Sequence, residues 1–244
     1  MSRNTFAIII GFLVLASGAF VTWRTIVRLT PPPTPKATVT IPEGWTVAQV
    51  NDLLKKKGVL VDRELPLVLE GYLFPDTYEF FLGSSVDVVQ NRFLDNLQNQ
   101  LGDLGLTLET EQAKEILTMA SLIQLEIKQA GEMRVASGLL WKRIDAGIPL
   151  QVDATLCYVK SQAGEACLPL RGADKTIESP YNTYLYQGLP PGPVANPGLD
   201  AIKAATDPAR SPYWYYLSDP KTGRTIFART LDEHNQNVIK YLSE

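Results

Sequence analysis

The feature that most limits how this chain can fold is an uncharged apolar run near its N-terminus, from Thr5 to Trp23. A helix needs about 20 such residues to cross a bilayer, and the terminal Trp suits the membrane interface. We therefore expect residues 1–28 to form a short cytoplasmic tip and a single transmembrane anchor. A cleaved signal peptide is the alternative, because Ala16, Ser17 and Gly18 offer small residues to a peptidase.

The segment after this run predicts a spacer followed by a small folded piece. Residues 29–38 contain the proline run from Pro31 to Pro35, which favours a stiff, extended spacer. Residues 39–68 then indicate a short strand, a turn and a helix. Thr46 and Gln49 form a capping box at the start of that helix. A piece of this size cannot fold alone, so it must pack on something else.

The remainder of the chain is predicted to be helical first and rich in strands and loops afterwards. The sequence has 244 residues, of which 45% are hydrophobic, which is sufficient for a core. Ser84 and Asp87 are predicted to cap the first helix of this part. Helices are predicted at residues 84–101, 111–129, 132–146 and 199–205. Strands are predicted at residues 150–159, 213–217 and 225–228. The whole indicates an α+β fold.

Composition excludes several classes of function. The net charge of -3 argues against a dedicated nucleic-acid binder. The single histidine, His234, and the absence of a CxxC pair argue against the usual zinc sites, and no phosphate-binding loop or nucleophile motif occurs. We expect no metal or cofactor. Cys157 and Cys167 could form a disulfide or remain two free thiols.

One acidic residue lies where a general acid could work. The helix predicted at 111–129 is apolar around most of its circumference, so it should be largely buried. Gln124 lies near the middle of its apolar stripe and Glu126 at the edge. A carboxyl among apolar side chains has a raised pKa, which a general acid near neutral pH requires. The alternative is a structural glutamate, exposed or ion-paired with Lys128 or Arg143, and periodicity alone favours it.

Three other acids are weaker candidates. Glu132 begins the next helix, where a carboxylate is stabilised by the helix dipole. Asp153 stands in the run LQVDATLCY, which reads as a strand, and its side chain faces either a pocket or solvent. Asp76 follows a proline and is most simply a turn residue.

Several separated motifs, all in one order, resemble the YceG-like family of endolytic murein transglycosylases. The resemblance spans about Val39 to Leu242. The motifs are IPEGWTVAQV, LEGYLFPDTYEF, ASLIQLE, EMRVASGLLWKRIDAGIPLQVDATLCY, SPYNTYLYQGLPPGPVANPGLDAIKAA and FARTLDEHN.

The resemblance implies a site. The family's helical motif approximates ASxxEKE, and its second Glu, the catalytic one, falls on Glu126. Three positions depart from the pattern: Gln124 replaces the first Glu, Lys142 an Asn, and Ala154 a Pro. The substrate-binding residues implied by resemblance are Gln124, Glu132, Gln151, Asp153, Tyr181, Asn182 and Thr183.

The resemblance also implies an activity and a location. Family members cleave the bond between N-acetylmuramic acid (MurNAc) and N-acetylglucosamine (GlcNAc) in peptidoglycan, leaving 1,6-anhydro ends. It implies a reduced LysM-like subdomain at 39–68 and a catalytic domain at 69–244. It further implies a single-pass protein of the bacterial cytoplasmic membrane, whose catalytic domain faces the periplasm or cell exterior. Glycan strands, and peptidoglycan synthases, are the implied partners.

Two other functions stay open at this point. The departures at Gln124 and Lys142, with the short front half, fit an inactive or partner-dependent peptidoglycan-binding membrane protein. A hydrolase on the same glycan is the other alternative, with Asp153 or Glu132 as a second carboxylate.

Overall fold

The computed structural model describes residues 34–242. The predicted membrane anchor at residues 1–28 lies outside these residues, as does the first half of the predicted spacer, residues 29–33. Within the described part of the chain, no helix combines the length and the apolar character that crossing a membrane requires. From Lys36 onward the chain forms one unit with two hydrophobic cores.

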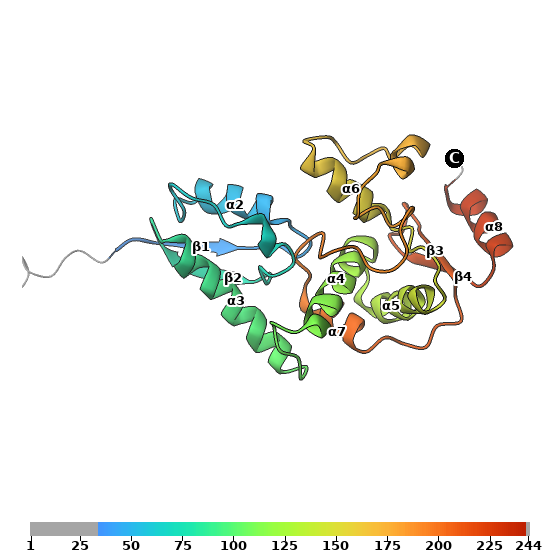
Figure 1. Ribbon diagram of the computed structural model, residues 1–244, viewed down its shortest axis with the longest axis horizontal. Coiled ribbons are helices and arrows are strands. Elements are labelled where there is room, and N and C mark those ends of the chain that lie inside the picture. The colour runs from blue at the N-terminus through green and yellow to red at the C-terminus, as the bar shows by residue number, and fades with distance from the viewer. Residues whose placement is uncertain (1–33, 243–244) are drawn as a thin grey trace, which may run out of the picture. The chain divides into compact units, whose positions relative to one another are not determined.

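The smaller core forms around a two-stranded antiparallel sheet. Strand β1 (Lys36–Thr40) pairs with β2 (Thr77–Phe81). The predicted strand therefore has its partner in a segment that follows helix α2 (Val47–Lys56) in the sequence. Helix α2 begins at the predicted capping box of Thr46, which is confirmed. Figure 1 shows this sheet with α2 and α3 (Val86–Gly102) around it. The core therefore joins residues from both predicted domains, and their division at residue 68 stays a prediction.

The cap predicted for α3 is off by one residue. Ser85, and not Ser84, has the extended backbone of an N-cap, and its Oγ accepts from the backbone N–H of Val88 over 3.4 Å. Ser84 Oγ donates instead to the carbonyl of Phe81 over 2.7 Å. The N-cap is the residue immediately before the first helical residue, and its side chain accepts from an N–H two or three positions further on, so the start of the helix at Val86 selects Ser85.

The larger core is built around α4 (Glu111–Glu126), whose residues from Ile116 to Ile123 are all buried. This confirms that the helix is buried around most of its circumference. Helix α7 (Leu199–Thr206) packs against α4 and against α5 (Ala130–Asp145), as Figure 1 shows.

Two helix boundaries differ from the sequence prediction. Helix α4 ends at Glu126 and not at residue 129, because Ile127 has an extended backbone that turns its side chain into the core. Helix α5 begins at Ala130, so Gly131 lies in its first turn instead of separating two helices. The first turn has few intrahelical hydrogen bonds to lose, and a glycine there is tolerated.

The strand predicted at residues 150–159 is wrong, because this segment contains helix α6 (Asp153–Gln162). Leu150, Val152, Ala154 and Leu156 do alternate as in a half-buried strand, but this alternation does not decide the structure. Asp153 lies in the first turn, where its charge favours a helix, and no strand among the described residues pairs with this segment. Helix α6 packs against α4, which places its N-terminus beside Glu126.

The last part of the chain contains the second sheet. Strands β3 (Tyr215–Ser218) and β4 (Thr225–Ala228) form an antiparallel hairpin where strands were predicted. Helix α8 (Leu231–Leu242) packs against both strands (Figure 1). Short 3-10 helices lie at Leu67–Leu69 (η1) and Gly172–Thr176 (η2). The α+β fold is therefore confirmed, although its second half holds more helix than expected.

Candidate active site

A cavity of about 650 Å³ lies beside the C-terminal end of α4. Its wall combines the end of α4, the last turn of α5, the start of α6, strand β3 and helix α8. The polar side chains that line it are Glu126, Arg143, Gln151, Asp153, Lys175, Tyr184, Tyr215, Tyr216, Ser218 and His234.

Glu126 is held by two uncharged donors. The backbone N–H of Ala154 donates to its Oε1 over 3.2 Å, and the hydroxyl of Tyr216 lies 3.3 Å from its Oε2. Burial raises the pKa of Glu126, the hydrogen bonds from Ala154 and Tyr216 lower it, and the charge of Asp153 adds to the rise, so that the net pKa is about 7. No described cation lies within ion-pair distance of Glu126. The ion-paired structural alternative is therefore wrong.

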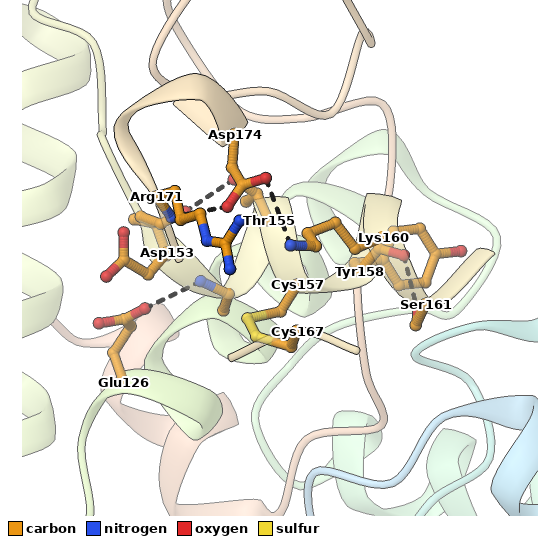
Figure 2. Close-up of a disulfide and its surroundings, with 12 residues drawn as sticks. Glu126, Asp153, Thr155, Cys157, Tyr158, Lys160, Ser161, Cys167, Arg171 and Asp174 are labelled. Carbon is orange, nitrogen blue, oxygen red and sulfur yellow. Dashed lines mark hydrogen bonds and ion pairs between the residues drawn. A yellow bond between two sulfur atoms is a disulfide. The ribbon is translucent and has the colours of Figure 1, made fainter. Parts of the chain in front are cut away.

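Helix α6 presents its N-terminus to this carboxyl. Figure 2 shows Glu126 and Asp153 together at that end of the helix. The first N–H groups of a helix have no intrahelical acceptor, and the N–H of Ala154 donates to Glu126 instead. The start of the helix is fixed by Thr183, whose Oγ1 accepts from the backbone N–H of Val152 over 3.0 Å and lies 3.0 Å from Thr155 Oγ1.

Gln151 stands in a left-handed backbone conformation, with φ of 54°. This conformation costs a side-chain-bearing residue about 1 kcal/mol or more. Its N–H donates to the carbonyl of Thr183 over 2.9 Å, and its Oε1 accepts from Arg143 Nη2 over 3.1 Å. The strained turn thus directs a side-chain acceptor toward the arginine in the cavity wall.

The second carboxylate in the wall, Asp153, accepts a 2.5 Å hydrogen bond from the hydroxyl of Tyr184. Asn182 is fully buried and does not line the cavity. Its Oδ1 accepts from the backbone N–H of Tyr184 over 2.9 Å, and its Nδ2 donates to the carbonyls of Lys175 and Ile177. Asn182 therefore shapes the loop that carries Tyr184, and Thr183 shapes the start of α6.

Like Asn182 and Thr183, three further predicted site residues lie outside the cavity wall. Gln124 Oε1 accepts from the backbone N–H of Gly198 over 2.9 Å and so holds the start of α7. Glu132 Oε2 accepts from the backbone N–H of Thr225 over 2.8 Å and fastens β4 to α5. The ring of Tyr181 packs on Tyr158 and lines a different cavity. Glu126, Gln151 and Asp153 are the predicted residues that the fold brings together.

Several residues of the wall were not predicted as site residues. Arg143 was considered only as an ion-pair partner of Glu126, and Tyr216 was read as part of a strand. His234 recurs with Val238 and Leu242 at helical spacing, and these three line the cavity as one stripe of α8. That stripe is a signal which the sequence carries, although it does not show what the helix faces.

A disulfide joins Cys157 on α6 to Cys167 on the following loop (Figure 2), which settles the open alternative. A second link is the 3.3 Å ion pair between Lys160 on α6 and Asp174 in η2, which follows this loop. Lys175 is the next residue and lines the cavity. Two links therefore hold this part of the wall against α6. Within residues 34–242, no group of three His, Cys, Asp or Glu side chains is arranged to hold a metal.

The chain is similar to proteins of known family. A curated relative from Bacillus subtilis, named endolytic murein transglycosylase, is 35% identical over 181 residues, which are 72% of this chain and 48% of the relative. A relative of the same name from Streptococcus pneumoniae is 29% identical over 72% of this chain and 32% of its own length. The chain thus spans half, or less, of these curated relatives.

A solved structure supports the same relationship. The crystal structure of a yceG-like protein from Listeria monocytogenes matches 85% of this chain and 77% of its own, with a TM-score of 0.68 and 27% identity. The sequence model of the YceG-like family matches residues 17–240. Because that match covers most of the sequence, the chain belongs to the YceG-like family.

Proposed function

We propose that this protein is an endolytic lytic transglycosylase, which cleaves the MurNAc–GlcNAc bond of peptidoglycan and leaves 1,6-anhydro-MurNAc ends. The observation that carries the proposal is Glu126, a carboxyl in a cavity with a pKa raised to about 7 and no cationic partner among the described residues. Such a group is present in both protonation states near neutral pH. The names of the curated relatives support the same activity.

The reaction needs one residue that first gives and then takes a proton. Protonated Glu126 donates to the glycosidic oxygen as the bond to C1 of MurNAc breaks. The carboxylate then accepts the proton of the C6 hydroxyl, whose oxygen bonds to C1 and closes the anhydro ring. No water enters, and the enzyme regains its proton. The N–H of Ala154 and the hydroxyl of Tyr216 stabilise the carboxylate between these steps.

A hydrolase is the chemical rival, because Asp153 is a second carboxylate in the same wall. In a hydrolase it would act as nucleophile or activate water. Its short hydrogen bond from Tyr184 instead favours a fixed role, as a negative charge near the oxocarbenium-like transition state. Glu132, the other candidate, is committed to the backbone of Thr225 outside the wall.

The alternative of an inactive, glycan-binding protein depended on the short front half and on two departures from the family pattern. Gln124 holds Gly198, and Lys142 Nζ donates to the carbonyl of Ser211 over 2.8 Å. Neither side chain lines the cavity. Their contacts are with backbone groups, and these contacts favour structural roles that do not bear on the acid.

We also propose that residues 1–28 anchor the protein in the bacterial cytoplasmic membrane, with the catalytic part outside the cytosol and close to peptidoglycan synthases. The uncharged run from Thr5 to Trp23 and the proline spacer support this location. Protease added to intact spheroplasts should digest a tag placed after Glu244. Protection of that tag until the membrane is opened would contradict the orientation.

The test of endolytic action is the length distribution of the products. Uncrosslinked glycan strands of defined length, digested by the full chain in detergent, should give fragments of many intermediate lengths at early times. Accumulation of disaccharides alone would indicate cutting from chain ends. A folded Glu126→Gln variant should leave the strands intact, and cleavage by that variant would overturn the assignment of the acid.

A further inference from the structure

Arg143 is a buried cation without an anionic partner. Its side chain is in the last turn of α5, the residue is 7% exposed, and it lines the cavity beside Glu126. No described carboxylate lies within ion-pair distance of it. Of its five N–H donors, a single Nη2 bond to Gln151 is made, and Nε has no partner among residues 34–242. Buried charges are normally paired, so this group requires an explanation.

A second unpartnered polar atom belongs to the same wall. His234 Nδ1 is buried and has no hydrogen-bond partner in the described chain. The His234 ring stacks on Tyr215 with 5.4 Å between centroids, and Arg143 Cζ lies 5.8 Å from the centroid of that same Tyr215 ring. The two side chains thus come from different helices and pack against one shared ring. Unpaired buried polar groups are rare in native proteins, and two of them on side chains that border one cavity point to a polar binding site.

The chemistry of these groups specifies the ligand. A guanidinium is only a donor, and its planar arrangement of N–H groups suits the oxygen of a carbonyl or carboxylate. The one protein acceptor in contact with it, Gln151 Oε1, is positioned by a strained backbone turn and fixes the orientation of the guanidinium. The remaining donors are left for an acceptor that enters the cavity.

We propose that Arg143 and His234 form an acyl-oxygen subsite, which binds a carbonyl or carboxylate oxygen carried by the sugar next to the cleaved bond. This inference rests on the proposed function for the identity of the glycan. Two kinds of acyl group occur there, the N-acetyl group of each sugar and the lactyl group of MurNAc. Binding either one would orient the sugar relative to Glu126, which makes Arg143 and His234 positioning residues.

The test is calorimetric binding of soluble glycan strands to the full chain in detergent, with Glu126→Gln added to prevent cleavage. Arg143→Met should weaken binding by about 10- to 100-fold, the range for loss of a charged hydrogen bond, and Arg143→Lys should restore part of it. Arg134→Met is the matched control, because Arg134 lies on the same helix and pairs with Asp207 outside the cavity. Equal affinities for the Arg143→Met and Arg134→Met proteins would overturn the subsite.

Modified strands identify the acyl group and keep the test valid if Arg143→Met does not fold. Chemically N-deacetylated strands should bind the parent protein as weakly as the variant binds intact strands, if the N-acetyl oxygen is the ligand. Strands whose stem peptides have been removed by an amidase carry a lactyl carboxylate, and they should bind more tightly if the lactyl oxygen is the ligand. Equal binding of intact, N-deacetylated and amidase-treated strands would overturn the subsite. Failure to bind any strand would instead overturn the proposed function.

Activity provides a second readout. In the Glu126-containing protein, His234→Phe keeps the ring on Tyr215 but removes both nitrogens. It should raise KM for intact strands about 10-fold with a smaller change in kcat, because ground-state binding of the sugar is lost. A lower kcat with unchanged KM would contradict a positioning role for this residue.

Discussion

The backbone N–H of Ala154 donates to Glu126 Oε1 over 3.2 Å, and it is a donor that the family pattern would not supply. The position of Ala154 resembles one where the family has proline, and proline has no N–H. In this chain the helix N-terminus therefore stabilises the ionised form of Glu126 directly. This contact lowers the pKa of Glu126 from the higher value that burial alone would produce.

Replacing Ala154 with Pro should therefore raise the pKa of Glu126. Proline is compatible with the first turn of a helix, and loss of a hydrogen bond to a charged group corresponds to about one pKa unit. Because the protonated acid is the active form, the high-pH limb of the activity profile should move upward by about that amount. Ala154→Ser, which keeps the N–H, should leave the limb in place. A folded Pro variant with an unshifted limb would refute the role of this contact.

Glu70 predicts a pH dependence of stability. Its residue is 5% exposed, its oxygens accept from the backbone N–H of Val47, and burial raises the pKa of its carboxyl to about 7. The folded state thus holds a proton that the unfolded state releases near pH 4.5. The stabilisation is complete below that pH and is lost as the pH rises through 7, a change of about 3 kcal/mol.

Glu70→Gln removes this titration while keeping an acceptor for Val47. Glu126 contributes in the same direction, so urea unfolding should show a smaller loss of stability between pH 5 and 8 in either single Gln variant than in the unmodified protein. The double variant should show the smallest loss. An unchanged pH dependence in Glu70→Gln would contradict the raised pKa of that carboxyl.

Asn196 links the two cores. It is fully buried, its Oδ1 accepts from the backbone N–H of Leu73 over 2.8 Å, and its Nδ2 donates to the carbonyl of Trp45 over 2.7 Å. Asn196→Ala should lower the free energy of unfolding by about 1–3 kcal/mol, because the buried backbone N–H of Leu73 loses its acceptor, whereas the carbonyl of Trp45 keeps the backbone N–H of residue 196 as a donor. Asn91→Ala, at an exposed position of α3, is the control. Similar unfolding midpoints for the two variants would argue against this link.

The disulfide should stabilise the fold to a moderate extent. Cys157 and Cys167 are separated by 10 residues, and a loop of this size corresponds to about 2–3 kcal/mol. Replacing both with Ser should lower the unfolding free energy by this amount. Thiol titration of the unreduced, denatured protein should find no reactive cysteine. Two titratable thiols in that experiment would mean that the pair is not joined.

Local features were the ones that the sequence could predict. The capping box of Thr46 and the burial of α4 depend on neighbouring residues and on helical period, and both are confirmed. The cap at Ser85 was missed by one position because two adjacent serines offer the same chemistry. The run that became α6 mixes β-branched residues with apolar alternation, and only its packing against α4 decides for a helix.

The sequence indicated the candidate acid, Glu126, but few of the side chains that surround it in the cavity. Helical periodicity made Glu126 a candidate but favoured a structural role for it, and the family resemblance singled it out. Tyr216 and His234 reach the same cavity from elements that begin more than eighty residues later, and their arrangement depends on how β3 and α8 pack. Gln124 looked equally suited to a cleft, but a residue two positions away on a helix faces a different side, and here it meets α7.

The most direct test of the central claim is digestion of purified peptidoglycan by the full chain in water enriched in oxygen-18, followed by mass spectrometry of the new glycan ends. We predict 1,6-anhydro ends, lighter by one water than reducing ends, without incorporated label, and none of these ends with Glu126→Gln. New reducing ends that carry one oxygen-18 atom would mean that water attacks C1. That result would contradict the transglycosylase account and assign Asp153 a direct part in hydrolysis.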